Sequence, residues 1–139
     1  MKLSVLMPVF NEKLWVEEIV ERVVKQNVQG VHSREIIIVD DGSTDGTREI
    51  LQSLSQRHKN VISPVYHKRN MGKGAAIRTA IEKMSGDICI IQDADLEYNP
   101  ADYPLVLEPI ISGRADCVYG SRFVGAQSKR VLFFWHSVG

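Results

Sequence analysis

The chain has 139 residues, of which 44% are hydrophobic and 24% charged, as in one soluble globular domain. Its 17 basic and 17 acidic residues give a formal net charge of zero, so we expect no nucleic-acid partner and no bulk attraction to an anionic membrane. Its apolar stretches are shorter than the roughly 20 residues that span a bilayer, and residues 1–8 are too short for a signal peptide. We therefore expect a cytoplasmic domain, or one at the cytosolic face of a membrane.

The first half of the chain alternates strand-like and helix-like segments. Residues 3–7 predict a buried strand that ends at Pro8, and residues 36–39 predict a second strand. Between them, apolar side chains recur at helical spacing and define an inward face: Trp15, Ile19, Val20, Val23 and Val24. Turn residues 42–46 precede a helix with three inward positions: Ile50, Leu51 and Leu54. Residues 61–65 contain a proline and predict a weaker strand near a sheet edge.

The second half continues this alternation. Residues 73–84 predict a third helix with a single inward face: Ile77, Ala80, Ile81 and Met84. Residues 88–92 predict a fourth strand and residues 117–119 a fifth, with a helix from Pro104 toward Ser112 between them. Apolar strands that alternate with amphipathic helices favour a parallel sheet covered by helices on both faces. The sequence therefore predicts one α/β domain over residues 1–139.

The cysteines and histidines give no metal-binding pattern. Cys89 and Cys117 lie in apolar, strand-like runs, so we expect two buried, reduced thiols. The 4 histidines lack the spacing of metal ligands, and we interpret all of them as surface or packing residues. Residues 131–139 end just after an apolar run, which indicates a fragment of a longer chain. Lys129 and Arg130 leave two interpretations of that run open, a core helix cut short or an interfacial approach to a membrane.

Two carboxylates one residue apart, Asp93 and Asp95, follow the fourth predicted strand. In extended backbone they project to the same side and can converge. Ligands of open α/β sheets bind at the carboxyl ends of the strands. Paired carboxylates at such a place favour Mg²⁺ or Mn²⁺, which completes its ligand shell with substrate phosphates. A solvated loop is the alternative, because the two-carboxylate pattern alone has low specificity.

Polar residues also follow the first two predicted strands. Asp41 is suited to accept hydrogen bonds from a nucleotide base or ribose, with Asp40 the weaker candidate. A glycine turn and helix capping, for which Asp45 is also suited, explain this segment without a ligand. Phe10 is suited to stack on a flat base, and Glu12 to accept from the polar edge of that base. The alternative for this second pair is a hydrophobic staple and cap of the first helix.

Two basic features are candidates for binding an anion. Residues 68–74 form a basic, glycine-containing loop at the start of the third predicted helix, where N–H groups and Lys73 favour an anion. The loop lacks the P-loop spacing, and Ile77 fills the third glycine position of the dinucleotide fingerprint. Arg122 is suited to clamp a diphosphate in a bidentate fork. A solvated loop and a surface ion pair are the respective alternatives.

Five segments together resemble family 2 glycosyltransferases, namely residues 8–12, 39–43, 72–74, 93–95 and 120–123. They are most similar to the branch of dolichol-phosphate mannose synthases and polyprenyl-phosphate glycosyltransferases, and the resemblance covers nearly the whole chain. It implies a single GT-A catalytic domain that is cut short at its C-terminal end. Such a domain moves a hexose with inversion from a GDP-mannose or UDP-glucose type of donor to a polyprenyl or dolichyl phosphate, using Mg²⁺ or Mn²⁺.

The resemblance also assigns roles to individual residues. It places three residues near the base (Pro8, Phe10 and Glu12) and two beside base and ribose (Val39 and Asp41). It gives the metal and the sugar diphosphate to Asp93, Ala94 and Asp95. Glu97 stands where this branch often has glutamine, near the metal or sugar, and Arg122 contacts the diphosphate. Asp93, Asp95 and Arg122 are therefore the expected catalytic residues.

Two other classes of protein remain as alternatives. One is a nucleotide-sugar-binding fragment without turnover, because acceptor-site residues that such enzymes carry further along are absent. The other is a phospho-acceptor signalling domain, which also gathers aspartates at strand ends. That fold needs an acidic pair after its first strand, where this chain has Asn11 and Glu12.

Overall fold

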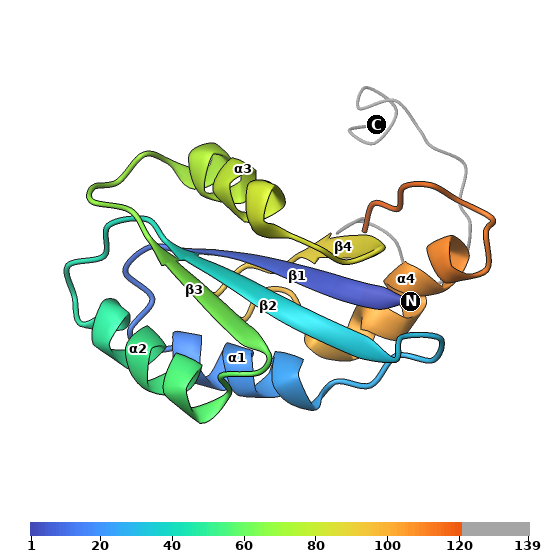
Figure 1. Ribbon diagram of the computed structural model, residues 1–139, viewed down its shortest axis with the longest axis horizontal. Helices are drawn as coiled ribbons and strands as arrows, with labels where there is room; N and C mark the ends of the chain where they lie inside the picture. The colour runs from blue at the N-terminus through green and yellow to red at the C-terminus, as the bar shows by residue number, and fades with distance from the viewer. Residues whose placement is uncertain (121–139) are drawn as a thin grey trace, which may run out of the picture.

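Four parallel strands form one sheet in the order β3-β2-β1-β4 (Figure 1). The computed structural model describes residues 1–120 and bounds the strands as β1 (Lys2–Val9), β2 (Ser33–Asp40), β3 (Ile62–Tyr66) and β4 (Ile88–Ile91). The parallel sheet and the edge position of β3 confirm the sequence-based predictions. The fifth strand predicted over residues 117–119 is wrong: this segment is irregular, pairs with none of the four strands, and leaves Tyr119 90% exposed.

Strand β1 continues through Pro8 instead of ending before it. The carbonyl of Leu6 accepts a hydrogen bond from the N–H of Gln92, on the β4 side of the strand. Pro8, two residues further, turns its backbone to the same side. Because β4 ends at Ile91, the missing N–H of Pro8 leaves no ladder bond unmade.

Helices cover both faces of the sheet, as predicted. Figure 1 shows α3 (Lys73–Lys83) on one face and α1 (Val16–Lys25), α2 (Thr47–Arg57) and α4 (Tyr103–Ile111) on the other, with a short 3-10 turn, η1 (Pro100–Asp102), before α4. Alternate β1 side chains divide the core accordingly, since Leu3, Val5, Met7 and Val9 belong to the larger cluster and Leu6 to the smaller one under α3.

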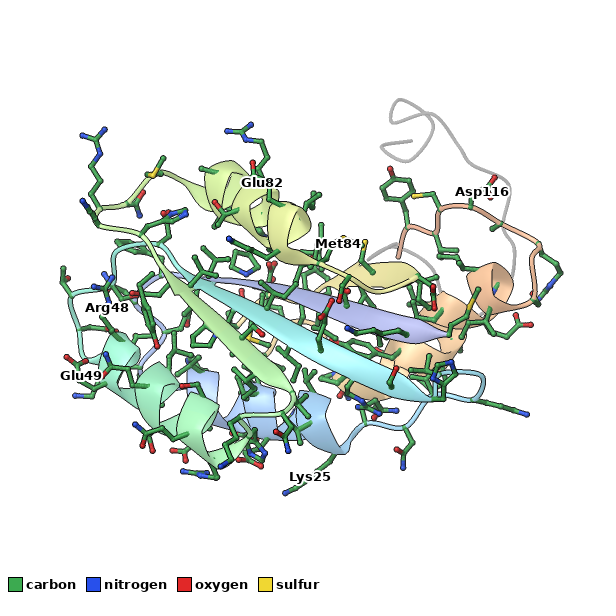
Figure 2. The ribbon with its side chains drawn as sticks, viewed as in Figure 1. Lys25, Arg48, Glu49, Glu82, Met84 and Asp116 are labelled. Carbon is green, nitrogen blue, oxygen red and sulfur yellow. The ribbon has the colours of Figure 1, made fainter. Side chains whose placement is uncertain are left out.

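Helix α3 packs on the sheet through small residues. Ala76 and Ala80 are fully buried against Leu6, Ile37 and Val39, and Met84 lies on the sheet side of the helix while Glu82 points outward (Figure 2). Ile81, predicted to face inward, is 50% exposed because it lies about 100° around the helix from Ala80. Trp15, also predicted inward, precedes α1 and is 44% exposed.

The prediction of two buried thiols is wrong. Cys89 is exposed on the edge strand β4, where it pairs with Ser4 on the α3 face of the sheet. Helix α3 packs against β1 and β2, so it does not cover this outer strand. Cys117 is exposed in the irregular segment after α4. None of the helices within residues 1–120 has the length and apolar character needed to cross a bilayer.

Candidate functional site

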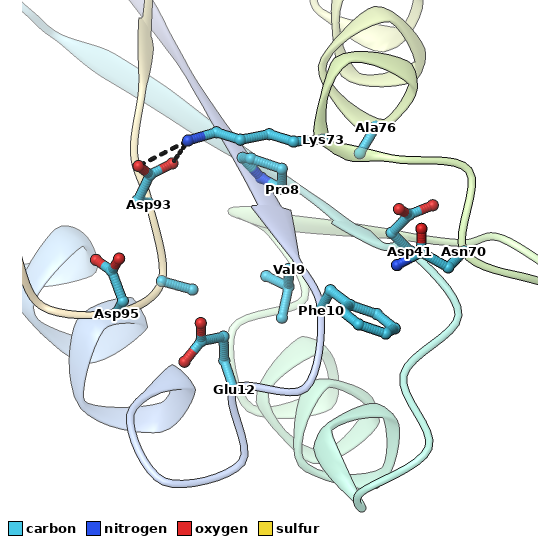
Figure 3. A pocket seen from close by; sticks show the side chains of 11 residues that line it. Pro8, Val9, Phe10, Glu12, Asp41, Asn70, Lys73, Ala76, Asp93 and Asp95 are labelled. Atoms are coloured by element: carbon cyan, nitrogen blue, oxygen red, sulfur yellow. Dashed lines mark hydrogen bonds and ion pairs between the residues drawn. The ribbon is translucent and has the colours of Figure 1, made fainter.

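A pocket of about 280 Å³ lies where β1, β2 and β4 end (Figure 3). Parallel strands bring their carboxyl ends to one edge, so residues far apart in sequence meet there. Eight predicted site residues line the pocket: Pro8, Phe10, Glu12, Asp41, Lys73, Asp93, Ala94 and Asp95. Val9, Asn70 and Ala76, which were not predicted, also line it.

Two of the predicted site residues that the structure describes do not line the pocket. Val39 is fully buried in the core cluster under α3. Glu97 lies in the loop after β4, where its N–H donates to Asp95 Oδ1 at 3.0 Å. Arg122 lies outside the residues that the structure describes, as do Lys129, Arg130 and the apolar run after them.

Asp93 pairs with Lys73 across the pocket. The Lys73 Nζ atom lies 2.7 Å from Asp93 Oδ1 and 2.8 Å from Oδ2 (Figure 3). Figure 3 shows Glu12 and Asp95 on the same side of the pocket as Asp93. Burial raises the pKa of Glu12, and the charges of Asp95, Asp45 and Asp93 raise it further. This part of the pocket therefore concentrates negative charge. The ammonium group of Lys73 lies beside it, paired with Asp93.

Asp41 holds the segment between β3 and α3. Its Oδ1 atom lies 2.7 Å from His67 Nδ1 and accepts from the Met71 N–H at 2.9 Å, while Oδ2 accepts from the Gly72 N–H at 2.8 Å. Burial opposes the charged form, but the hydrogen bonds from His67, Met71 and Gly72 outweigh it and lower the pKa of Asp41. Asp41 thus lines the same pocket as Asp93 and Asp95 while fixing the wall that leads to Lys73.

Gly42 allows two loops to meet at this wall. It has a φ of 80°, and a Cβ atom there would lie 2.6 Å from the carbonyl carbon of Arg69 and from the nitrogen of Asn70. Asp40, the weaker sequence candidate, is fully buried and accepts from Arg48 Nε at 2.7 Å and from the Ser43 N–H at 3.1 Å. Asp40 therefore stabilises the turn, and only its neighbour Asp41 reaches the pocket.

The segment that carries Phe10 and Glu12 is anchored to the start of α2. The Asn11 N–H donates to Ser43 Oγ at 2.9 Å, and Asn11 Oδ1 accepts from the Thr44 N–H at 2.9 Å. The Glu12 N–H donates to Thr47 Oγ1 at 3.0 Å. Asn11 adopts a left-handed φ of 52°, a conformation in which asparagine is enriched. These contacts fix the first wall of the pocket and leave Phe10 43% exposed.

Two residues that sequence reasoning missed organise the site. His67 follows β3 and bridges Asp41 to Thr79 Oγ1, which lies 3.0 Å from His67 Nε2. Its place at the end of a strand was the signal that could have identified it. Gln92, interpreted as the last residue of a strand, is 1% exposed and hydrogen-bonds to the loop that carries Asp93 and Asp95. Its signal was a polar residue within a predicted apolar strand, directly before Asp93.

The donors at the pocket suit a divalent cation. Among residues 1–120, no group of three or more His, Cys, Asp or Glu side chains is arranged to enclose a metal ion by itself. Asp93 and Asp95 supply two hard carboxylate donors beside an open pocket. Mg²⁺ and related ions are commonly held by one or two carboxylates together with water and substrate phosphates. The residues present therefore fit a cation that arrives with a phosphorylated ligand.

Solved structures with the same fold include glycosyltransferases. The mannosyltransferase PcManGT from Pyrobaculum calidifontis, in complex with GDP-Man and Mn²⁺, aligns with a TM-score of 0.63 and 29% identity, over 72% of this chain and 29% of that one. TarS 1-349 of S. aureus, in complex with UDP-GlcNAc, aligns with a TM-score of 0.66 and 25% identity, over 81% of this chain and 32% of that one. The GT-A type of fold that the resemblance implied is confirmed.

Curated relatives act on lipid phosphates, according to their names. An undecaprenyl-phosphate 4-deoxy-4-formamido-L-arabinose transferase of Pseudomonas aeruginosa is 36% identical over 110 residues, or 79% of this chain and 32% of the relative. A dolichol-phosphate mannosyltransferase of Pyrococcus furiosus is 35% identical over 124 residues, or 89% of this chain and 34% of the relative. The chain thus spans about a third of the length of these relatives. Residues 4–135 match the model described as Glycosyl transferase family 2. The chain belongs to this family.

Proposed function

We propose that the chain forms the donor-binding part of a glycosyltransferase that moves a hexose from a nucleoside diphosphate sugar to a polyprenyl phosphate. The observation that carries the proposal is the shared pocket of Phe10, Glu12, Lys73, Asp93 and Asp95. It joins an exposed aromatic ring, a lysine at the start of a helix and two carboxylates suited to bind a divalent cation. The named activities of the two relatives support the choice of acceptor.

The pocket suits the three parts of such a donor. The half-exposed ring of Phe10 stacks on the base, and Glu12 accepts from the polar edge of the base. Lys73 and the first N–H groups of α3, which lack partners within the helix, face the diphosphate. Asp41 keeps this wall in place through Met71 and Gly72.

Asp93 and Asp95 would hold Mg²⁺ or Mn²⁺. When bound, the cation neutralises the charge that develops on the nucleoside diphosphate leaving group. Lys73 adds a positive charge beside Asp93, and Arg122 is proposed to contact the same diphosphate.

In the proposed reaction, a phosphate oxygen of the acceptor attacks the anomeric carbon from the side opposite the diphosphate. The new carbon–oxygen bond forms as the bond to the diphosphate breaks, so the configuration inverts. The acceptor oxygen is already anionic and needs little assistance from a base. The catalytic effect then comes from positioning and electrostatic stabilisation. A lipid-linked acceptor would place the protein at the cytosolic face of a membrane.

Calorimetric titration of the chain with UDP-glucose and GDP-mannose, with and without Mn²⁺, tests donor binding. A transfer assay with a short polyprenyl phosphate then tests turnover. We expect Mn²⁺-dependent binding of one of the two donors and formation of the lipid-linked sugar. Binding without transfer would favour the alternative, a donor-binding fragment that lacks acceptor-site residues. Absence of binding to either donor would contradict both.

A further inference from the structure

The side chain of Gln92 ties together both ends of the loop that carries Asp93 and Asp95. Its Nε2 atom donates to the carbonyl of Asp93 at 2.9 Å and to the carbonyl of Tyr98 at 3.0 Å. A primary amide has two N–H donors, so both are used on the backbone of this one loop. Gln92 is 1% exposed, which removes water as a competing partner.

Tyr103 of α4 fixes the other end of the same amide. Its hydroxyl donates to Gln92 Oε1 at 2.7 Å, and Tyr103 is itself 3% exposed. Burial raises the pKa of Tyr103, so the hydroxyl keeps its proton at neutral pH. The two loop carbonyls fix which end of the amide faces the loop, since they accept only from its N–H groups and leave its oxygen to accept from Tyr103.

The loop between these anchors adopts an unfavourable backbone conformation. Leu96 has a φ of 66°, which a leucine adopts only where its surroundings impose it. The side chain of Leu96 packs against the larger core cluster, and the Glu97 N–H donates to Asp95 Oδ1. The left-handed turn therefore sets the direction of the Asp95 carboxylate. The Gln92 amide holds the backbone on both sides of that turn, through the carbonyls of Asp93 and Tyr98.

We propose that Gln92, held by Tyr103, is a positioning residue that fixes the Asp93–Asp95 loop in the geometry that receives the metal–diphosphate ligand. This inference rests on the proposed function. A buried polar network with every member satisfied makes its surroundings rigid. Metal-binding carboxylates depend on such supporting contacts, whose loss commonly lowers metal affinity about 10–100-fold.

Gln92→Met tests the inference, because the methionine side chain is similar to glutamine in length and volume but makes none of the three hydrogen bonds. Ser4→Ala is the matched control. Ser4 is also fully buried, and its hydroxyl joins Glu35 and the Gly86 N–H at the opposite end of the sheet. We expect Gln92→Met to speed hydrogen exchange of the Glu97 amide at least about tenfold in metal-free protein. We expect a loss of about tenfold or more in Mn²⁺ affinity, measured by electron paramagnetic resonance with UDP or GDP present. Ser4→Ala should change each value less than about twofold.

Each result decides one question. If folded Gln92→Met keeps wild-type exchange at Glu97, or exchanges faster with unchanged Mn²⁺ affinity, the positioning role is overturned. If the wild-type chain binds no Mn²⁺ with either nucleotide, the proposed function fails, and the exchange rate alone decides whether Gln92 orders the loop. If Gln92→Met does not fold, Tyr103→Phe replaces it. That variant should show about a threefold change in both measurements, and no change would overturn the inference.

Discussion

Lys73, in the first turn of α3, forms an ion pair with Asp93, which follows β4, with Nζ 2.7 Å from Oδ1. The pair joins the start of a helix that covers the sheet to the loop that ends an edge strand. The Lys73 side chain is 58% exposed and that of Asp93 19%, and ion pairs at the surface contribute only about 0–1 kcal/mol to stability. Under the proposed function, both residues act on the diphosphate of the donor and its cation.

Lys73→Met should weaken binding of a nucleoside diphosphate about tenfold and leave binding of the nucleoside unchanged, because only the diphosphate meets the ammonium group. Calorimetry with UDP, GDP and the two nucleosides measures this difference. Lys83→Met, an exposed lysine in the last turn of the same helix, is the control. Equal loss in both variants would show that the effect is general electrostatics.

Asp95→Asn should abolish the Mn²⁺-dependent part of nucleotide binding while it shifts the thermal midpoint by less than about 2 °C. The amide oxygen can still accept from the Glu97 N–H, so the turn is retained, but the negative charge for the cation is lost. Calorimetry with and without Mn²⁺, together with a thermal scan, checks both parts. A large loss of stability with binding retained would assign Asp95 to the architecture of the loop.

Glu35 should make the stability of the fold depend on pH in acid. Burial disfavours its charge, but hydrogen bonds from Ser4, Ser85 and Lys2 lower its pKa to about 2. A pKa that is lower in the folded state gives stability that is present above the unfolded value of 4.5 and is lost as the pH falls toward 2.

The shift in the pKa of Glu35 corresponds to about 3 kcal/mol at neutral pH. Glu35→Gln should remove most of this dependence in urea unfolding measured between about pH 2 and pH 7. Glu49→Gln, an exposed site on α2, serves as the control. The same pH profile in wild type and Glu35→Gln would contradict the assignment.

Gly42→Ala should destabilise the protein more than Gly46→Ala. Both glycines have positive φ, 80° and 98°, so alanine at either site adopts a left-handed conformation that costs about 1–2 kcal/mol. At Gly42 the new Cβ would also meet backbone atoms of Arg69 and Asn70 at 2.6 Å, whereas at Gly46 it would meet only the flexible Lys13 side chain, at 3.5 Å. We expect at least about 1 kcal/mol of additional loss at Gly42 in chemical unfolding. Equal losses would show that the two loops separate without penalty.

The sequence predicted the strands and the pocket better than the contacts around them. Apolar runs followed by Asp41 and Asp93 mark strand ends wherever these strands lie in the sheet, and parallel strands then bring such residues to one edge. The exposure of Cys89 depends on which strand lies at the edge and how far α3 reaches, and neither follows from a local apolar run.

Helix orientation and side-chain networks were also beyond local patterns. The inward face of α3 is centred on Ala76 and Ala80, because the sheet lies close to the helix there, while the larger Ile81 is half-exposed. The roles of His67 and Gln92 depend on the paths of loops that come from other parts of the chain. Periodicity contains no information about these paths.

The most direct test of the shared pocket is a crystal structure of the chain soaked with Mn²⁺ and UDP or GDP, with the metal located by its anomalous scattering. We predict one peak within coordination distance of carboxylate oxygens of Asp93 and Asp95, a diphosphate beside Lys73, and a base against Phe10. A peak elsewhere, or a nucleotide bound outside the pocket between Phe10 and Asp93, would contradict the account.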